Sequence, residues 1–181
     1  FHVAKEDIIH IEEERLRSVT KEILMTQDIS EKDALLATDA LIKADLRGVE
    51  SHGVSNMLRA YLGAFKSNSL NPKPNWKIVK ETASCATINS DNGLGIVVAP
   101  QAMEIAVEKA KKTGAGIVTM NNCGHLGMLA YHSMIASDND MIGTTMAACS
   151  PRMVPTYSSV RALGTNPISY SAPADKLPDF V

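Results

Sequence analysis

Two histidines and several separate arginines stand in short polar segments between apolar stretches. The segment ADLRGVESHGVSNMLR, residues 44–59, holds Ser51 and His52 together with Arg47 and Arg59. A histidine with an ordinary pKa of about 6.5 can take up or release a proton near neutral pH. An arginine can hold a carboxylate through a two-pronged ion pair. The segment therefore predicts acid–base chemistry on a small anionic molecule.

The same segment also has a purely structural interpretation. Ser51 stands before a helical pattern whose apolar stripe begins at Met57, so its hydroxyl is predicted to cap that helix. The first N–H groups of such a helix attract an anion. A capped helix with a surface histidine and solvated arginines accounts for these residues without catalysis, and both interpretations stay open on this segment alone.

Two further polar clusters follow later in the chain. In NNCGHLGMLAYH, residues 121–132, His125 stands where a predicted strand gives way to a helix, a place where α/β proteins bind ligands. In RALGTNPISY, residues 161–170, Thr165 and Asn166 offer a hydroxyl and an amide just before a proline. Either cluster taken singly is also compatible with an ordinary turn.

The composition is that of a globular protein with mixed charge. The chain has 181 residues, a formal net charge of −2 and 45% hydrophobic residues. Its charges form no basic stripe for nucleic acid, and no apolar run approaches the roughly 18 residues of a membrane span. The expected partner is therefore a small molecule or another protein, and neither nucleic acid nor a membrane.

The cysteines and histidines predict neither a disulfide framework nor a metal site. Cys85, Cys123 and Cys149 are odd in number and lie far apart, without a C-x-x-C pair. His132 follows His125 by two helical turns, too far to share one metal ion with it, and is predicted to be a structural or surface residue. Reduced cysteines fit a cytoplasmic location.

The apolar periodicity predicts a helical N-terminal region, residues 1–75, followed by an α/β region, residues 76–181. The expected helices span residues 5–27, 30–48, 98–112 and 126–137, and a further helix lies between the second and the NPKPN segment at 71–75. The expected strands span residues 76–80, 85–89, 115–120, 141–148 and 167–172. The chain starts without Met and stops inside the apolar LPDFV. We therefore expect part of a longer protein, truncated at its C-terminal end.

One glycine pattern, DNGLGIVVAP at residues 91–100, stands where a Rossmann fold binds a dinucleotide. It follows a predicted strand and opens a helix, but Val98 takes the place of the third glycine. The next strand ends in Met120 and two asparagines, without the acidic residue that binds a ribose. An ordinary helix start is the better interpretation.

The segments ADLRGVESHGV, NNCGHLG and LGTNPISYSAP, in this order and at these separations, resemble the malate/L-lactate dehydrogenase type 2 family. The resemblance runs from about Lys5 to the end of the chain. It implies an NAD(P)-dependent oxidoreductase that acts on a small 2-hydroxy or 2-oxo acid and forms a homodimer. The implied fold is α/β, with a helical N-terminal region and a non-Rossmann cofactor domain built on a mainly antiparallel sheet.

The resemblance also implies roles for individual residues. His52 matches the motif histidine proposed as proton donor or acceptor, with Ser51 beside it in a relay. His125 matches a second histidine that is treated as the proton acceptor in some members, so the choice between the two stays open. Positions lining the substrate and the nicotinamide are Leu126, Gly127, Thr165 and, next to it, Asn166; positions touching the cofactor are His125, Cys149, Ser150 and Thr165.

The chain departs from the family pattern at one position that matters for substrate binding. Many relatives carry an arginine five residues after the motif serine, where it grips the substrate carboxylate, and Asn56 stands there instead. Arg59 lies one turn later on the same predicted helix face, and Arg47 precedes the motif. These three residues are the candidates for substrate binding at this end of the site.

The first hypothesis is hydride transfer between a nicotinamide and a 2-hydroxy acid. Malate is the first candidate for this substrate, and lactate, ureidoglycolate and sulfolactate are the alternatives. NAD and NADP both stay open, because the residues that read the 2′-phosphate are expected beyond Val181. A hydrolase that uses Ser51 or Cys123 with a histidine base is the alternative, although the chain has no G-x-S-x-G elbow. A non-catalytic binding subunit is a third possibility.

Overall fold

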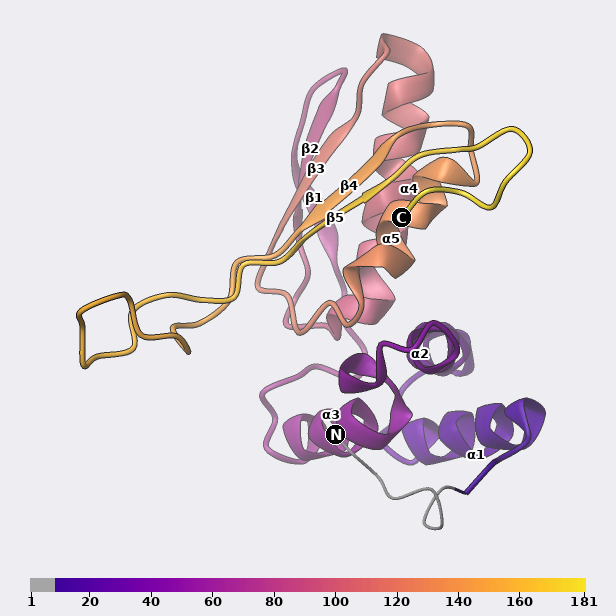
Figure 1. Cartoon of the computed structure of the whole chain (residues 1–181), viewed down its shortest axis with the longest axis vertical. Helices are drawn as coiled ribbons and strands as arrows, with labels where there is room; N and C mark the ends of the chain where they lie inside the picture. The colour runs from indigo at the N-terminus through magenta and orange to yellow at the C-terminus, as the bar shows by residue number, and fades with distance from the viewer. Residues whose placement is uncertain (1–8) are drawn as a thin grey trace.

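Three N-terminal helices lie beneath two small sheets and two further helices in the computed structural model, which describes residues 9–181 (Figure 1). The elements are α1 (Glu13–Met25), α2 (Glu31–Leu46), the 3-10 turn η2 (Glu50–His52), α3 (Val54–Lys66), β1 (Lys77–Glu81), β2 (Cys85–Asn89), α4 (Gly95–Thr113), β3 (Ile117–Asn121), α5 (Leu129–Ser137), β4 (Gly143–Met146) and β5 (Ile168–Ser171). Pairs β1–β2 and β4–β5 are antiparallel, and β2–β3 is parallel. The predicted α/β class with a mainly antiparallel sheet is confirmed.

Helix α2 begins and ends where the sequence predicts. Ser30 Oγ accepts a hydrogen bond from the Asp33 backbone N–H at 3.1 Å, and its own hydroxyl donates to the Asp33 carboxylate at 2.8 Å. Gly48 adopts the left-handed conformation, with φ of 71°, just beyond the last turn. Local capping chemistry therefore fixes both ends of this helix.

Helix α1 is shorter than the helix predicted over residues 5–27. The predicted start lies outside the described residues, and residues 9–12 are not helical. Ile9 and Ile11 are 83% and 56% exposed. Because they have no surface to pack against, a further helical turn here would gain little stability.

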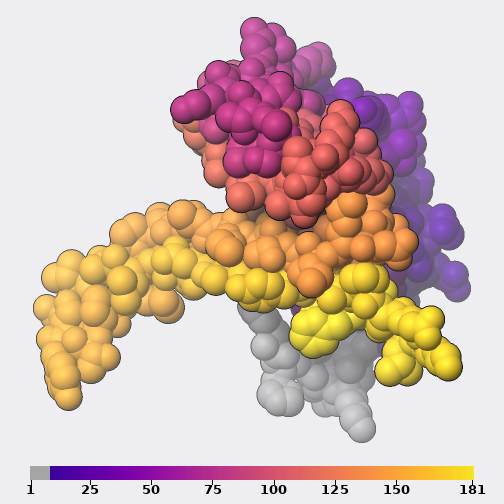
Figure 2. Space-filling view, turned by 90° about the horizontal axis from the view of Figure 1, so that it is seen from above, coloured from indigo at the N-terminus to yellow at the C-terminus, as the bar shows by residue number. Residues whose placement is uncertain are grey.

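The two sheets are each covered by a helix on one face. Helix α4 connects the parallel strands β2 and β3, and Val98 on this helix packs against Ile88 of β2. Helix α5 packs on the β4–β5 pair, where Ser171 Oγ donates to the Ser133 carbonyl oxygen. Beyond this pair, residues 147–167 form a long arm that projects from the body and whose two sides meet at the bridge between Met153 and Leu163 (Figures 1 and 2).

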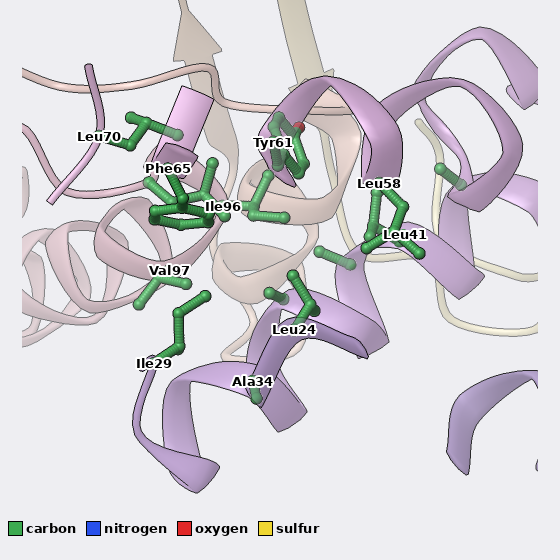
Figure 3. Packing of buried hydrophobic residues seen from close by; sticks show 14 of the residues in the cluster. Leu24, Ile29, Ala34, Leu41, Leu58, Tyr61, Phe65, Leu70, Ile96 and Val97 are labelled. Atoms are coloured by element: carbon green, nitrogen blue, oxygen red, sulfur yellow. The ribbon is translucent and has the colours of Figure 1, made fainter. Parts of the chain in front are cut away.

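A single large apolar cluster joins the helical layer to the α/β layer (Figure 3). It contains Leu24 of α1, Leu41 of α2 and Tyr61 of α3, together with Ile96 of α4 and Met128 just before α5. Both predicted regions thus contribute side chains to one core. The division into units at residue 75 stays a prediction.

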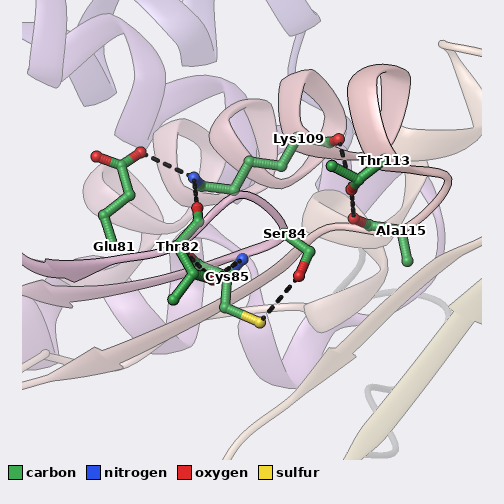
Figure 4. Close-up of polar contacts among 7 residues, drawn as sticks. All are labelled: Glu81, Thr82, Ser84, Cys85, Lys109, Thr113 and Ala115. Atoms are coloured by element: carbon green, nitrogen blue, oxygen red, sulfur yellow. Dashed lines mark hydrogen bonds and ion pairs between the residues drawn. The ribbon is translucent and has the colours of Figure 1, made fainter.

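A buried lysine anchors the turn between β1 and β2 to α4 (Figure 4). Lys109 Nζ donates to the Glu81 carboxylate and to the Thr82 carbonyl oxygen, each at 2.8 Å. The lysine side chain is only 10% exposed, so its charge needs these partners. The contact fixes the outer edge of the three-stranded sheet against the helix.

Across residues 9–181, none of the helices combines the length and apolar character that crossing a bilayer requires.

Candidate active site

The two motif histidines lie together at the junction of the helical and α/β layers. His52 belongs to the turn η2, and His125 lies in the segment between β3 and α5. Their rings stack with centroids 5.4 Å apart and planes inclined by 16°. The fold thus brings two histidines that are distant in the sequence side by side, and their roles in catalysis stay predictions.

Ser51 contacts the histidine beside it and does not cap α3. Its Oγ lies 2.8 Å from His52 Nδ1. The α3 N-terminus is capped instead by Asp45, whose Oδ2 accepts from the Val54 N–H at 2.9 Å. The cap prediction was wrong because η2 intervenes before the helix. The tight turn brings the adjacent Ser51 and His52 side chains together.

Gly53 makes this arrangement possible. It is the N-cap position of α3, and a Cβ at Gly53 would overlap the Asp45 carboxylate. The anion that the helix N-terminus attracts is therefore the carboxylate of Asp45 itself. Burial raises the pKa of Asp45, against the opposing effect of the hydrogen bond from Val54, and the charge of Glu50 raises it further.

His125 is held by a side chain that the sequence did not single out for the site. Tyr61 Oη lies 2.9 Å from His125 Nδ1, and the Gly127 backbone N–H donates to the same nitrogen at 3.3 Å. Tyr61 lies on the buried side of α3 and is 3% exposed. A buried tyrosine needs a partner for its hydroxyl, which was the available signal.

The segment that carries His125 is itself fixed from two sides. His132 Nε2 donates to the Leu126 carbonyl oxygen at 2.7 Å. His132 is 1% exposed, so its prediction as a structural residue is confirmed. On the other side, a Cβ at Gly95 would come within 2.6 Å of the His125 carbonyl oxygen. The glycine turn before α4 therefore packs directly against the histidine segment.

Both stacked rings favour the uncharged form. Burial lowers the pKa of His52. His125 keeps an exposed face, but the desolvation of its packed side lowers its pKa, and the charges of His52 and Arg152 lower it further. Neither Nε2 atom has a hydrogen-bond partner within the described part of the chain. Each ring thus presents one unpaired nitrogen near neutral pH.

The predicted carboxylate-binding residues have different surroundings. The Asn56 amide donates to the Glu50 carbonyl oxygen at 2.9 Å and so braces η2. Arg47 and Arg59 are exposed, and neither forms an ion pair with any residue from 9 to 181. Arg152, in the arm, is the arginine whose charge acts on His125. The sequence did not single it out.

The predicted cofactor-binding residues lie where the arm joins β4 and β5. The Cys149 backbone N–H donates to Asn166 Oδ1 at 3.0 Å, which ties the two sides of the arm together. Ser150 and Thr165 are exposed beside this contact. Their polar groups are therefore available to a ligand.

Nucleophilic and metal chemistry have little basis among the described residues. Burial raises the pKa of Cys123, which keeps its thiol protonated. Within residues 9–181, no group of three or more His, Cys, Asp or Glu side chains could hold a metal ion. The paired imidazoles are the chemically distinctive feature of this region.

The fold is α/β, and it places two stacked histidines between a helical layer and an α/β layer. The model of the malate/L-lactate dehydrogenase family matches residues 11–181. The chain belongs to this family, and the resemblance drawn from the three motifs is confirmed. The hydrolase alternative finds no support among these relatives.

Individual relatives agree with this assignment. The malate dehydrogenase of Pyrococcus abyssi is 40% identical over 173 residues, which are 96% of this chain and 48% of that protein. The L-sulfolactate dehydrogenase of Methanocaldococcus jannaschii is 41% identical over 155 residues, 86% of this chain and 45% of that protein. The chain thus spans about half the length of the curated relatives it matches.

The solved structure of malate dehydrogenase from Pyrococcus horikoshii OT3 has the same fold over this length. It matches with a TM-score of 0.94 and 39% sequence identity, covering 99% of this chain and 51% of that one. The arrangement of helices and sheets described above is therefore that of a known dehydrogenase.

Proposed function

We propose that the protein is an NAD(P)-dependent dehydrogenase that interconverts a 2-hydroxy acid and the corresponding 2-oxo acid. The observation that carries this proposal is the stacked pair of His52 and His125, each with an unpaired Nε2. Oxidation of a hydroxyl group requires a base for its proton, and reduction of the carbonyl requires an acid. An imidazole with a lowered pKa is suited to the first role near neutral pH.

A nicotinamide, when bound, supplies the acceptor or donor of the hydride. Thr165, Ser150 and the backbone at Cys149 are the residues of this chain that we expect to hold it, and they fit because exposed hydroxyl and backbone groups can pair with a carboxamide. The glycine turn before α4 does not take part in the proposal, because Gly95 is packed against the histidine segment. NAD and NADP are both retained as candidates.

The substrate class follows from the relatives with the highest identity quoted above. One is named a malate dehydrogenase and another an L-sulfolactate dehydrogenase. Malate and sulfolactate are both 2-hydroxy acids with a second acidic group, so we propose a dianionic substrate, with malate first. We propose Arg152, Arg47 and Arg59 as the cations that bind it, while Leu126 and Gly127, which follow His125 in the chain, would contact it.

The resemblance also supports a homodimer and a cytoplasmic location. Both belong to the proposal, and sedimentation velocity on the purified protein tests the first. A monomer at assay concentration would contradict the dimer without affecting the proposed reaction.

A nicotinamide absorbance assay tests the function directly. Malate, sulfolactate, lactate and ureidoglycolate are supplied in parallel with NAD or NADP, and formation of the reduced nicotinamide is followed. We expect turnover with malate or sulfolactate to exceed turnover with lactate. Absence of reduced nicotinamide with every pair would contradict the proposal, and turnover without nicotinamide would favour a different class of enzyme.

A further inference from the structure

The hydrogen bonds of the two histidines are chemically unequal. The backbone N–H of Gly127 can only donate a hydrogen bond, and it lies 3.3 Å from His125 Nδ1. To accept this bond, Nδ1 needs a free lone pair and therefore carries no proton. The Tyr61 hydroxyl, 2.9 Å from the same nitrogen, then donates as well. These two contacts favour the tautomer of neutral His125 that carries its ring proton on Nε2.

We infer that Tyr61 and the Gly127 backbone lock His125 as a neutral Nε2–H donor, so that His52, with Ser51 behind it, carries the substrate proton. This inference rests on the proposed function and deepens it by dividing the roles of the two rings. Tyr61 is a positioning residue in this arrangement, because it acts through His125.

Charging His125 would break the bonds that hold it. A proton on Nδ1 would face the Gly127 N–H and would force the Tyr61 hydroxyl to turn and accept. The groups that face this ring add to the effect, since the charges of His52 and Arg152 both oppose a positive charge on it. His125 is thus poor at taking up a proton but well placed to donate a hydrogen bond.

His52 can change its charge without losing a partner. Its Nδ1 contacts the Ser51 hydroxyl at 2.8 Å, and a hydroxyl both donates and accepts. With a proton on Nδ1, His52 keeps a free lone pair on Nε2; with a second proton on Nε2, the bond to Ser51 persists. Ser51 is exposed, so it connects this ring to water.

The oxidation step divides as follows among these groups. The substrate O–H bond breaks and its proton passes to His52 Nε2, while the C2–H bond breaks and its electron pair leaves with the hydride for the nicotinamide. The C–O single bond becomes C=O, and His125 Nε2–H donates a hydrogen bond to that oxygen. After the oxo acid has left, His52 releases the Nε2 proton to water and regains the neutral form with its proton on Nδ1, held by the Ser51 hydroxyl.

Nitrogen NMR of the purified protein reads the tautomer without any turnover. In the ¹⁵N-labelled protein, we expect His125 to show a protonated Nε2 and an unprotonated Nδ1. The variant Tyr61→Phe should shift the Nδ1 resonance and lower turnover about tenfold, as loss of a ring-orienting partner does. The control Tyr131→Phe removes another buried hydroxyl, which donates to Asp39 at 2.8 Å, and should leave the His125 resonances unchanged.

Glutamine variants separate the two roles in the assay. In His125→Gln the side-chain amide N–H replaces Nε2–H, so turnover should stay within about tenfold of the native value. The fall of kcat/KM at low pH should be retained. His52→Gln offers no base, so turnover should fall about a hundredfold or more, and the fall of kcat/KM at low pH should vanish. If the fall of kcat/KM at low pH is lost in His125→Gln and kept in His52→Gln, the inference is overturned.

Failure of the proposed function would look different. If no 2-hydroxy acid is oxidised with either nicotinamide, the reaction is wrong, and the nitrogen spectrum still decides the tautomer. A proton found on Nδ1 of His125 would overturn the lock, whatever the protein catalyses. A Tyr61→Phe spectrum identical to the native one at His125 would equally show that Tyr61 does not position the ring.

Discussion

At the scale of single residues, the chemistry of this site depends on which nitrogen each histidine has free. The motifs identified both rings from the sequence because histidine and its neighbours occur in recognisable short segments. They did not identify Tyr61, because its partner His125 lies far along the chain and a tyrosine on an apolar stripe is ordinary. Arg152 was missed for a related reason, since its nearness to His125 is created by folding.

Alanine substitution of either ring should lower turnover about a hundredfold. His52→Ala removes the proposed base, and His125→Ala removes the proposed hydrogen-bond donor to the substrate oxygen. Initial rates at saturating malate and nicotinamide check this. His10→Ala, at an exposed position outside the site, is the control and should keep native turnover. Unchanged turnover in His52→Ala would remove this residue from its role.

The buried His132 should make stability depend on pH. Burial lowers the pKa of His132 to about 4, against the smaller opposing effect of its bond to the Leu126 carbonyl. In the unfolded chain the pKa returns to about 6.5. The unfolded state therefore binds more protons between these values, so the free energy of unfolding falls as pH decreases from about 6.5 to about 4. His132 contributes about 3 kcal/mol to this loss.

Urea unfolding at several pH values measures the effect. His132→Gln keeps an amide N–H for the Leu126 carbonyl but cannot titrate, so its stability should decline less across this window. His10→Gln is the control and should follow the native protein. If His132→Gln and the native protein lose stability in parallel, the buried imidazole is not the source of the pH dependence.

At the scale of elements, tight packing at two helix starts positions the two histidines. The sequence predicted most helices and strands to within a few residues, because their periodicity and caps are local. It missed the cap of α3, since Asp45 reaches Val54 across the η2 turn, and that contact cannot be inferred from the Ser51 neighbourhood alone.

Removal of the Asp45 cap should affect both stability and catalysis. Asp45→Ala leaves the Val54 N–H unpaired, which should cost about 1–2 kcal/mol, and it loosens the turn that carries His52. Ser30→Ala removes the cap of α2 at a distance from the site and should cost a similar amount with turnover retained. Urea unfolding and initial rates distinguish them. Equal loss of turnover in both variants would indicate general destabilisation and not a role for Asp45 at the site.

Gly95 should tolerate no side chain. Its added Cβ would come within 2.6 Å of the His125 carbonyl oxygen, so Gly95→Ala should displace the histidine segment and lower both turnover and melting temperature. The matched control is Gly63→Ala, because a Cβ there meets nothing within 4 Å. That variant should gain up to about 1 kcal/mol from helix propensity. Native turnover in Gly95→Ala would show that the segment can shift without harm.

At the scale of the whole molecule, the helical and α/β layers share one core. The sequence predicted the two regions from a change in periodicity, but it could not show that Leu24 of α1 and Ile96 of α4 belong to the same apolar cluster. Nor could it show that residues 147–167 form an arm whose two sides pair, because the bridge between Met153 and Leu163 depends on tertiary geometry.

The shared core should make unfolding a single transition. Trp76 is the one tryptophan of the chain and packs on the sheet cluster around Ile88, so its fluorescence reports on the α/β layer. Far-UV circular dichroism reports mainly on the helices. If the core couples the layers, both signals should have the same midpoint in urea. Leu24→Ala, at a fully buried position of α1, should cost about 2–5 kcal/mol and lower both midpoints equally. A Trp76 midpoint that stays fixed while the dichroism midpoint falls would show that the layers fold as independent units, divided near residue 75.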